Sequence, residues 1–420
     1  MSENEPLSTE AYKGVRDFYP REFAAREAVF GTIRRTLGRY GYEEYNASPL
    51  ERAELYEAKT SEEIVNEQTY TFTDRGDRRV TLRPEMTPTL ARMVAGKRRE
   101  LVFPLRWFSI GNRFRYERPQ RGRLREFFQT DVDLLGLPAG EADIEVVTLA
   151  TQILKDLGAS DTDFIVRINS RELLTKACEA AGLLGDDVKR YMRLLDKKDK
   201  MPKDEFDALV REITKSDPLD LIANDDPRLS NAKRDILGTI VMLKERGVST
   251  ATFDPTLVRG FDYYTGITFE IFDTNPANPR ALFGGGRYDR LVALFGGNPI
   301  PAVGFAIGDV TLMDFLETHE LMPQGAGMPQ VYLGTLPEGL EAARAFADTL
   351  RAAGVRVFLN LTDRSIGDQV REAAKRGIPY FTTYGPDEAK SGALRVKHLE
   401  SGTEESLDEQ DVAAYLLSSR

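Results

Sequence analysis

Residues 109–135 read SIGNRFRYERPQRGRLREFFQTDVDLL. Proline and glycine at residues 119–122 are typical of a turn. The flanking residues, 109–117 and 123–135, predict the two arms of a β-hairpin. Strand patterns separated by short turns also dominate the chain before this hairpin, so we predict a sheet of hairpin-connected strands here.

Arginine is concentrated in this hairpin. Residues 113–125 include one glutamate, no lysine and six arginines: Arg113, Arg115, Arg118, Arg121, Arg123 and Arg125. A guanidinium group is planar and can bind phosphate or carboxylate through two hydrogen bonds, so this choice predicts an anion-binding surface of defined geometry. The alternative is a solvated loop whose arginines pair with acidic side chains elsewhere.

The second arm of the hairpin carries polar side chains at alternate positions. Because successive side chains of a strand point to opposite faces, Gln129, Asp131 and Asp133 should share one face with Arg123 and Arg125. We interpret this face as wet or ligand-facing.

A second polar cluster lies in residues 254–268, which read DPTLVRGFDYYTGIT. Arg259, Tyr263 and Tyr264 stand close to two glycines, Gly260 and Gly266, in a strand-like run, which predicts polar groups held on rigid backbone in a binding site. The alternative is an exposed edge strand with a salt bridge.

Two shorter segments add candidate ligand contacts. Glu85 and Thr87 lie where a strand is expected to give way to a helix, and the carboxylate could accept hydrogen bonds from an ammonium group. Thr87 fits equally well as the N-cap of that helix, because Pro88 follows it. The three glycines at residues 284–286 would let backbone approach a ligand and bring Tyr288 with it, although a flexible turn is the alternative.

Periodicity divides the chain into two domains. Proline and glycine cluster at residues 322–329, which predicts a linker between a domain at 1–325 and a domain at 330–420. Within the first domain, residues 171–247 show helical spacing and few strand signals, so we predict a helical insertion. After the linker, strands and helices alternate, which predicts a small parallel or mixed sheet covered by helices. Other elements expected in the first domain are helices over 21–40, 87–95 and 309–321, a strand over 45–50 and a hairpin over 70–82.

Composition narrows the classes of protein. The chain has 420 residues, 41% hydrophobic and 30% charged, as in soluble globular proteins. We expect a cytoplasmic protein without membrane contact, because the sequence contains neither a secretory signal nor a run of about 18 apolar residues. One cysteine, Cys178, and two histidines provide no cluster for zinc, so we predict no protein metal site. The net charge of -10 argues against a general nucleic-acid binder but allows a local basic surface.

Together these segments resemble a known family. Residues 257–266, LVRGFDYYTG, match a motif peculiar to histidyl-tRNA synthetases, and residues 114–119 and 122–127 are similar to motif 2 of class II aminoacyl-tRNA synthetases. Residues 41–50 resemble motif 1, whose proline, here Pro49, lies at the dimer interface in the family. The resemblance covers essentially the whole chain. It implies an α+β catalytic domain, an antiparallel sheet flanked by helices, with a helical insertion and a C-terminal α/β anticodon-binding domain.

The family resemblance also implies an activity and a set of site residues. The protein would be a homodimeric histidine-tRNA ligase that activates L-histidine with ATP and Mg²⁺ and transfers it to tRNA(His). Arg115 and Arg259 would be the catalytic cations. ATP would be bound by Arg115, Glu117, Arg123 and Phe127. Histidine would be bound by Glu85, Met86, Thr87, Arg115, Gln129, Asp133, Arg259, Tyr263, Tyr264 and Tyr288.

One motif departs from the family pattern. Class II motif 3 ends in a Gly-Leu-Glu-Arg type sequence whose arginine contacts ATP, whereas Thr311 stands at that position here. Either another arginine, Arg113 or Arg121, supplies the contact, or ATP binding is weaker, or activity is lost. The alternative function is a catalytically inactive, histidine-sensing regulatory paralogue of the ATP phosphoribosyltransferase complex. Such paralogues generally lack the C-terminal domain and degrade the Arg-Gly-x-Asp-Tyr-Tyr motif, both of which are present here.

Overall fold

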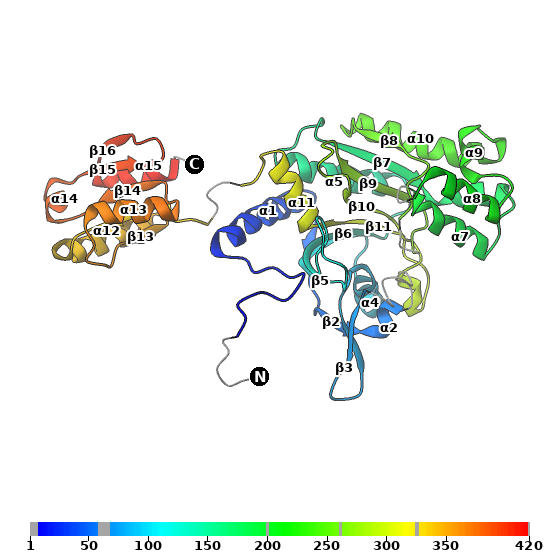
Figure 1. Ribbon diagram of the computed structural model, residues 1–420, viewed down its shortest axis with the longest axis horizontal. Coiled ribbons are helices and arrows are strands. Elements are labelled where there is room, and N and C mark those ends of the chain that lie inside the picture. The colour runs from blue at the N-terminus through cyan, green and yellow to red at the C-terminus, as the bar shows by residue number, and fades with distance from the viewer. Residues whose placement is uncertain (1–6, 58–67, 199–200, 260–262, 324–326, 419–420) are drawn as a thin grey trace. The chain divides into compact units, whose positions relative to one another are not determined.

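The computed structural model describes residues 7–57, 68–198, 201–259, 263–323 and 327–418 (Figure 1). The chain divides into two compact units, Met1–Asp17 with Val29–Met322, and Phe18–Ala28 with Pro323–Arg420. The larger segment of the second unit begins at Pro323, within the proline- and glycine-rich segment. Residues 324–326 of that segment lie outside the described residues.

The first unit is built on an eight-stranded sheet of order β1-β5-β6-β11-β10-β9-β7-β8. The six strands from β5 to β7 pair in antiparallel fashion, while β1 and β8 pair in parallel fashion at the two edges. The predicted antiparallel sheet is therefore confirmed for its centre, and the parallel edges make the whole sheet mixed. The strands are β1 (Glu43–Glu44), β5 (Leu105–Phe114), β6 (Glu126–Leu135), β7 (Phe164–Ser170), β8 (Ala251–Phe253), β9 (Ile267–Asp273), β10 (Ala281–Arg287) and β11 (Ala302–Gly308).

The arginine-rich hairpin is formed by β5 and β6. The two strands pair from Leu105 opposite Leu135 to Phe114 opposite Glu126. Beyond that pair the chain leaves the sheet, and residues 115–125 form an extended loop closed by an isolated bridge between Gln120 and Arg123. Arg123 and Arg125 therefore lie in the loop, and the prediction that they extend the polar face of β6 is wrong.

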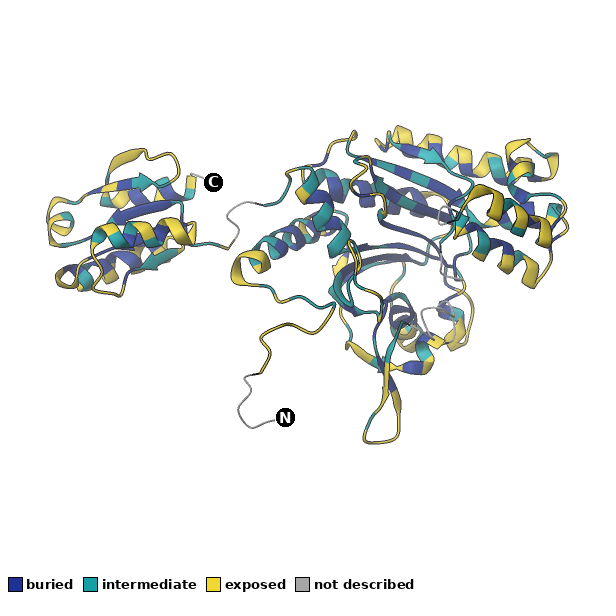
Figure 2. Ribbon diagram, in the orientation of Figure 1, coloured by how far each residue is buried: buried dark blue, intermediate teal, exposed yellow. Residues whose placement is uncertain are grey.

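Helices cover this sheet, and those of the predicted insertion confirm its helical character. The sheet is largely buried, whereas the outer faces of the insertion helices are exposed (Figure 2). Apolar side chains of helix and sheet form one large core. The helices of the first part are α1 (Pro20–Arg39), α2 (Ala53–Glu57), α4 (Thr87–Lys97), α5 (Glu141–Asp156) and α11 (Asp309–Thr318). Those of the insertion are α6 (Arg171–Ala180), α7 (Asp186–Leu195), α8 (Lys203–Ile213), α9 (Pro218–Ala223) and α10 (Ser230–Glu245).

A small three-stranded sheet of order β2-β4-β3 stands beside the main one. Its strands are β2 (Leu50–Arg52), β3 (Tyr70–Thr73) and β4 (Arg79–Leu82), so the hairpin expected over residues 70–82 is confirmed. The strand expected over residues 45–50 is wrong, because residues 45–49 belong to no strand and join β1 to β2. Pro49 has no backbone N–H for a ladder, which is consistent with this break.

Two expectations about local geometry near the candidate site are wrong. Thr87 is the first residue of α4 rather than its N-cap, which is Met86, and no side chain caps this helix. The polar segment at residues 254–268 is not a strand until Ile267, since Arg259, Tyr263 and Tyr264 lie in the connection between β8 and β9. A turn at Asp254 ends strand pairing, because its carboxylate accepts a hydrogen bond from the Thr256 N–H at 2.9 Å. Residues 260–262 of this motif lie outside the described residues.

The second unit contains a five-stranded mixed sheet of order β13-β12-β14-β15-β16. β13, β12 and β14 are parallel, and β15 and β16 are antiparallel additions, so the predicted small mixed sheet is confirmed. Strand β16 has the acidic sequence EESLD and was not predicted, because an exposed edge strand lacks the alternating apolar pattern. The elements are β12 (Val331–Gly334), α12 (Leu340–Ala352), β13 (Val357–Leu359), α13 (Ile366–Arg376), β14 (Tyr380–Thr383), α14 (Pro386–Ser391), β15 (Ala393–His398), β16 (Glu404–Asp408) and α15 (Val412–Ser418).

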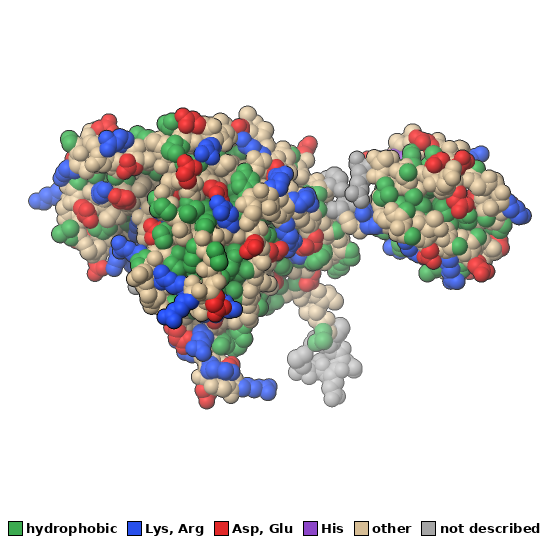
Figure 3. Space-filling view, turned by 180° about the vertical axis from the view of Figure 1, so that it is seen from behind, with side chains coloured by type: hydrophobic (Ala, Val, Ile, Leu, Met, Phe, Trp, Pro, Cys, Tyr) green, Lys and Arg blue, Asp and Glu red, His purple; other side chains and the backbone are tan. Residues whose placement is uncertain are grey.

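Charges of both signs are interspersed over the face of the protein seen in Figure 3. Among the described residues, no helix is long and apolar enough to cross a membrane.

Candidate active site

A cavity lies over strands β6 and β11, where the start of α4 and the connection between β8 and β9 meet the sheet. Nine of the ten side chains predicted to bind histidine line it, although they come from separate segments of the sequence. The lining residues are Glu85, Thr87, Arg115, Gln129, Asp131, Asp133, Arg259, Tyr263, Tyr264, Tyr288, Gly304, Phe305 and Ala306.

Met86 is the exception, because its side chain does not line the cavity. Its side chain is completely buried, and its sulfur accepts a hydrogen bond from Nη1 of Arg83 at 3.7 Å. Met86 precedes the first residue of α4, so it packs into the interior while Glu85 and Thr87 reach the cavity.

Asp133 is a buried acidic residue of the cavity wall. Its Oδ1 accepts a short hydrogen bond from the Tyr288 hydroxyl, whereas Oδ2 is buried without a hydrogen-bond partner among the described residues. Burial raises the pKa of Asp133 to about 8, and the neighbouring Asp131 carboxylate adds to this effect. A buried acceptor without a partner is costly, so Oδ2 marks a position where a ligand's hydrogen-bond donor would be bound.

A second acidic group, Glu85, lies in another part of the cavity wall. Its Oε2 accepts a hydrogen bond from the Tyr263 hydroxyl at 3.3 Å, and its side chain is buried. Burial raises the pKa of the Tyr263 hydroxyl well above its usual value, and the Glu85 carboxylate contributes. Tyr263 is therefore a neutral hydrogen-bond donor at physiological pH.

Gln129 and Asp131 are held by a buried ion pair behind the cavity. Nη2 of Arg113 lies 2.6 Å from Oδ2 of Asp131, and both side chains are almost completely buried. Nε2 of Gln129 donates to Oδ1 of Asp131 at 2.7 Å, so the Asp131 carboxylate is bound from both sides. The amide oxygen of Gln129 is then the group that can accept a hydrogen bond from a ligand. Asp131 itself was seen in the alternating pattern but was not predicted to be a site residue.

Arg259 brings positive charge to the cavity from the connection between β8 and β9. Its Nη1 lies 3.1 Å from Oε1 of Glu270 on β9, and its guanidinium lies 5.7 Å from the centre of the Tyr264 ring. Nε is buried and makes no hydrogen bond within the described ranges. Burial raises the pKa of Glu270, and the Arg259 charge opposes that rise.

Arg115 is the second cation of the cavity. Its Nε donates to the carbonyl oxygen of Pro84 at 3.0 Å, which fixes the guanidinium beside the Glu85 segment. The guanidinium also lies 5.2 Å from the centre of the Phe127 ring. Arg115 therefore links the cavity to the aromatic side chain predicted to stack on adenine.

The other residues predicted to bind ATP lie outside the cavity lining. Nη1 of Arg123 and Oε2 of Glu117 form an ion pair at 3.1 Å across the loop of the hairpin. Arg123 and Glu117 lie in the loop between β5 and β6, whereas Phe127 lies on β6 against Arg115. None of the three lines the cavity.

Two glycines of β10, Gly284 and Gly286, make room for site side chains. A Cβ atom at Gly284 would lie 2.3 Å from Nη1 of Arg259, and one at Gly286 would lie 2.8 Å from the Tyr264 ring. On β11, a Cβ at Gly304 would lie 2.4 Å from Oδ1 of Asp133. Glycine is thus required because charged and aromatic side chains pack directly on the strand backbone. Gly304, with Phe305 and Ala306, was not predicted in the lining, because only strand pairing brings it opposite Asp133.

The structure also places the candidates for the missing motif 3 arginine. Thr311, in the first turn of α11, donates its hydroxyl hydrogen to the carbonyl oxygen of Leu282 at 2.6 Å. Arg113 is buried in its pair with Asp131, so the suggestion that it contacts ATP is wrong. Arg121 remains available at the tip of the hairpin, where Nη2 donates to Oδ1 of Asn278 at 3.0 Å.

Known structures share this fold. A crystal structure titled histidyl-tRNA synthetase from Nostoc sp. PCC 7120 aligns with 99% of this chain and 100% of its own, with a TM-score of 0.83 and 23% identity. The fold is thus that of an aminoacyl-tRNA synthetase of this type.

Sequence comparison defines the family. The model of the family "Histidyl-tRNA synthetase" matches residues 14–311, and the model "Anticodon binding domain" matches residues 330–419. Proteins named histidine--tRNA ligase are similar, at 41% identity over 94% of each chain in Leptospira biflexa and 38% over 96% of each chain in Opitutus terrae. The chain belongs to the histidyl-tRNA synthetase family.

Proposed function

We propose that this protein is a histidine-tRNA ligase that activates L-histidine with ATP and transfers the histidyl group to tRNA(His). The observation that carries the proposal is the cavity itself, in which two arginines face buried acidic and phenolic groups. An amino acid with a polar side chain presents a carboxylate, an ammonium group and side-chain hydrogen-bonding atoms, and this cavity offers a complement to each.

In this proposal the two ends of histidine bind different walls. Glu85 and the amide oxygen of Gln129 accept hydrogen bonds from the ammonium group. The imidazole lies against Asp133, Tyr264 and Tyr288, where the unpartnered Oδ2 of Asp133, in the ionised form of the carboxyl group, accepts a ring N–H. A side chain lacking that donor would leave the acceptor unpaired, which can discriminate by about 10⁴ or more without editing.

Adenylate formation then requires alignment and charge stabilisation. The histidine carboxylate oxygen attacks the α-phosphorus of ATP, and pyrophosphate leaves. Arg115 and Arg259 stabilise the negative charge on the reacting carboxylate and α-phosphate, while Phe127 stacks on adenine beside Arg115. Because both guanidinium groups are held by hydrogen bonds to Pro84 and Glu270, they need little reorganisation as charge develops.

The proposal includes partners and a metal. The second unit, which matches the anticodon-binding family, would bind the anticodon of tRNA(His). Mg²⁺ would accompany ATP and neutralise phosphate charge, with phosphate oxygens and water supplying most of its ligands, as is usual for this ion. Among the described residues, no group of three His, Cys, Asp or Glu side chains could hold a metal ion. A homodimer, a cytoplasmic location and the domain limits at 1–325 and 330–420 complete the proposal.

The alternative is an inactive, histidine-sensing regulatory subunit. It shares the fold and would use the same amino-acid pocket, but it has no need for a second unit of the anticodon-binding type. A subunit that only senses histidine would also not need the cation Arg259, which lines the cavity and pairs with Glu270. We therefore favour the ligase.

Histidine-dependent exchange between pyrophosphate and ATP tests the choice. The ligase should show exchange that depends on histidine and on Mg²⁺, followed by histidylation of tRNA(His). Binding of histidine without exchange above background would support the regulatory subunit and reject the enzyme.

A further inference from the structure

Three segments converge at the tip of the arginine-rich hairpin. Gly122 lies at this tip with φ +76°, and a Cβ atom there would be 3.5 Å both from Cδ of Arg280 and from Cγ2 of Thr311. Arg280 directly precedes β10, and Thr311 lies in the first turn of α11. The stem of the Arg280 side chain therefore lies beside the position where class II motif 3 would place its arginine.

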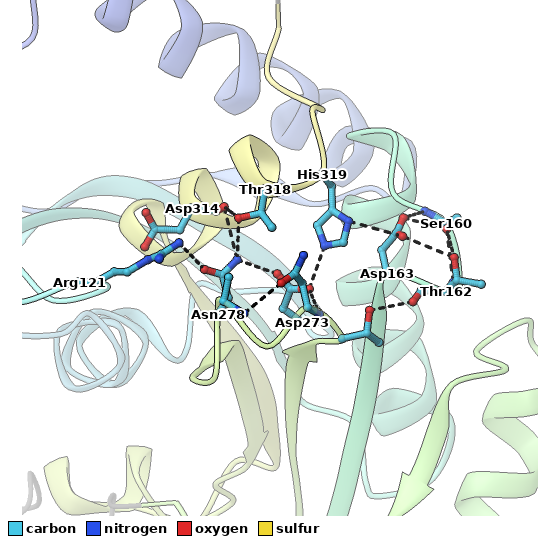
Figure 4. A network of polar contacts seen from close by, with 12 residues as sticks. Arg121, Ser160, Thr162, Asp163, Asp273, Asn278, Asp314, Thr318 and His319 are labelled. Atoms are coloured by element: carbon cyan, nitrogen blue, oxygen red, sulfur yellow. Dashed lines mark hydrogen bonds and ion pairs between the residues drawn. The ribbon is translucent and has the colours of Figure 1, made fainter.

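A polar network fixes the loop that carries Arg280. Asn278 is buried, and its Nδ2 donates to Oδ2 of Asp273 at 2.7 Å and to the Thr318 hydroxyl at 3.0 Å (Figure 4). Asp273 is bound in turn by Nε2 of His319 at 2.8 Å. On its other side, Oδ1 of Asn278 accepts the hydrogen bond from Arg121 in the hairpin loop. The loop before β10 is thus tied both to α11 and to the hairpin.

The neighbouring cations are already engaged by protein groups. Arg123 pairs with Glu117, and Arg16 lies 2.7 Å from Oδ2 of Asp309 at the start of α11. Arg280 is exposed and makes no hydrogen bond or ion pair within the described ranges. A guanidinium group with no acidic partner at the edge of a nucleotide site is suited to bind phosphate.

We propose that Arg280 binds the β- and γ-phosphates of ATP and supplies the positive charge that the missing motif 3 arginine would provide. This inference rests on the proposed function only in taking ATP as the ligand. In this proposal Arg115 and Arg259 hold the α-phosphate inside the cavity, and the terminal phosphates extend toward the hairpin tip, where Gly122, Arg280 and Thr311 meet. Arg121, held by Asn278, closes the same edge from the hairpin side.

Binding of ATP and AMP to the full-length protein, measured by calorimetry, separates this role from a structural one. Arg280→Ala should weaken ATP binding by about tenfold or more, the usual effect of losing a charge-assisted hydrogen bond. AMP lacks the terminal phosphates, so its affinity should stay within about twofold of wild type. Arg290→Ala is the matched control, because Arg290 is an exposed arginine just beyond the other end of β10. Arg16→Ala tests whether Arg16, the arginine paired with Asp309 at the start of α11, binds the terminal phosphates instead of Arg280.

Each outcome decides the proposal. Selective loss of ATP affinity in Arg280→Ala alone supports it. Equal effects of Arg280→Ala and Arg290→Ala, equal losses of ATP and AMP affinity, or a selective loss in Arg16→Ala would overturn it, as would a wild-type protein that binds no ATP. If wild type binds ATP without histidine-dependent exchange, the ligase proposal fails, while the comparison of ATP with AMP still decides the role of Arg280.

Discussion

The amino-acid pocket and the arginine-rich hairpin beside it solve different binding problems. In the pocket, polar groups are buried and fixed by neighbours, as in the Arg113–Asp131 pair, where 0% and 3% of the side chains are exposed. In the hairpin loop the corresponding pair is Arg123–Glu117, with 47% and 12% exposed. The pocket pair is therefore shielded from solvent, whereas the arginine of the hairpin pair is open to solvent.

This difference suggests how the two substrates are recognised. A small amino acid must be distinguished from others, so its site requires fixed acceptors and donors in a dry environment. A nucleoside triphosphate is highly charged, so exposed arginines can attract it. The loop then needs only to position these arginines so that they bind phosphate through two hydrogen bonds. The following predictions test that contrast, from the largest expected effect to the smallest.

Arg259→Ala should have the largest effect, on catalysis. Loss of one preorganised cation at the reacting groups should lower exchange by about 10² to 10³, equivalent to about 2.7 to 4 kcal/mol. Exchange kinetics measure the loss, and circular dichroism checks that the variant is folded. Arg290→Ala is the control for removing an arginine. Near-normal exchange by Arg259→Ala would show that the pocket's fixed cation is not catalytic.

Gly284→Ala tests whether the pocket's packing is as tight as the geometry indicates. The new methyl group would lie 2.3 Å from both Nη1 of Arg259 and the carbonyl oxygen of Phe269. Overpacking of this kind should lower the free energy of unfolding by about 1 to 3 kcal/mol and displace Arg259, so exchange should fall too. Denaturant unfolding measures the first effect. Gly38→Ala in α1, with nothing within 4 Å, is the control and should be neutral or stabilising. Equal stability of both variants would contradict tight packing at β10.

Asp133→Asn tests the pH dependence that burial gives to the pocket. The pKa of Asp133 is raised from 3.8 to about 8 in the folded protein. Between those values the folded state holds a proton that the unfolded state releases, so this stabilising contribution is present below the unfolded pKa and lost as pH rises through the folded pKa. Wild type should therefore lose more stability than Asp133→Asn between about pH 5 and about pH 8.5. Denaturant unfolding at several pH values would reveal parallel curves if the prediction is wrong.

Arg123→Ala should have the smallest effect on stability. Because Arg123 itself is exposed, its loss should change the free energy of unfolding by less than about 1 kcal/mol. The KM for ATP should nevertheless rise, while the KM for histidine should not. A drop in stability comparable to that of Gly284→Ala would mean that the hairpin is as rigid as the pocket.

Much of this arrangement was predictable from residue patterns. The long hairpin follows from proline and glycine between two strand-like arms, and the alternation of Gln129, Asp131 and Asp133 correctly predicts that the three share the cavity face. The family motifs brought together nearly all of the remaining lining residues. Those motifs are short, contiguous runs whose side-chain chemistry is unusual for a core.

The rest depends on contacts that no local pattern contains. The role of Gly304 depends on strand pairing, because β11 places it opposite Asp133 of β6. The position of Asp131 depends on its buried ion pair with Arg113 of β5. The side chain of Met86 lies outside the cavity lining because adjacency to Glu85 in sequence does not determine which way a side chain points at the start of a helix. Arg280 carries no motif at all, and its position beside Thr311 arises only where three distant segments meet.

The ion pair between Arg16 and Asp309 has a consequence for how the protein is made. Its two residues are 293 positions apart, and Oδ1 of the same aspartate accepts the Phe128 N–H at the start of the pocket strand. During synthesis at about 5 to 20 residues per second, Arg16 leaves the ribosome roughly 15 to 60 s before its partner exists. The first unit therefore cannot complete its active site from the N-terminus onward, and must wait for α11 to join its two ends.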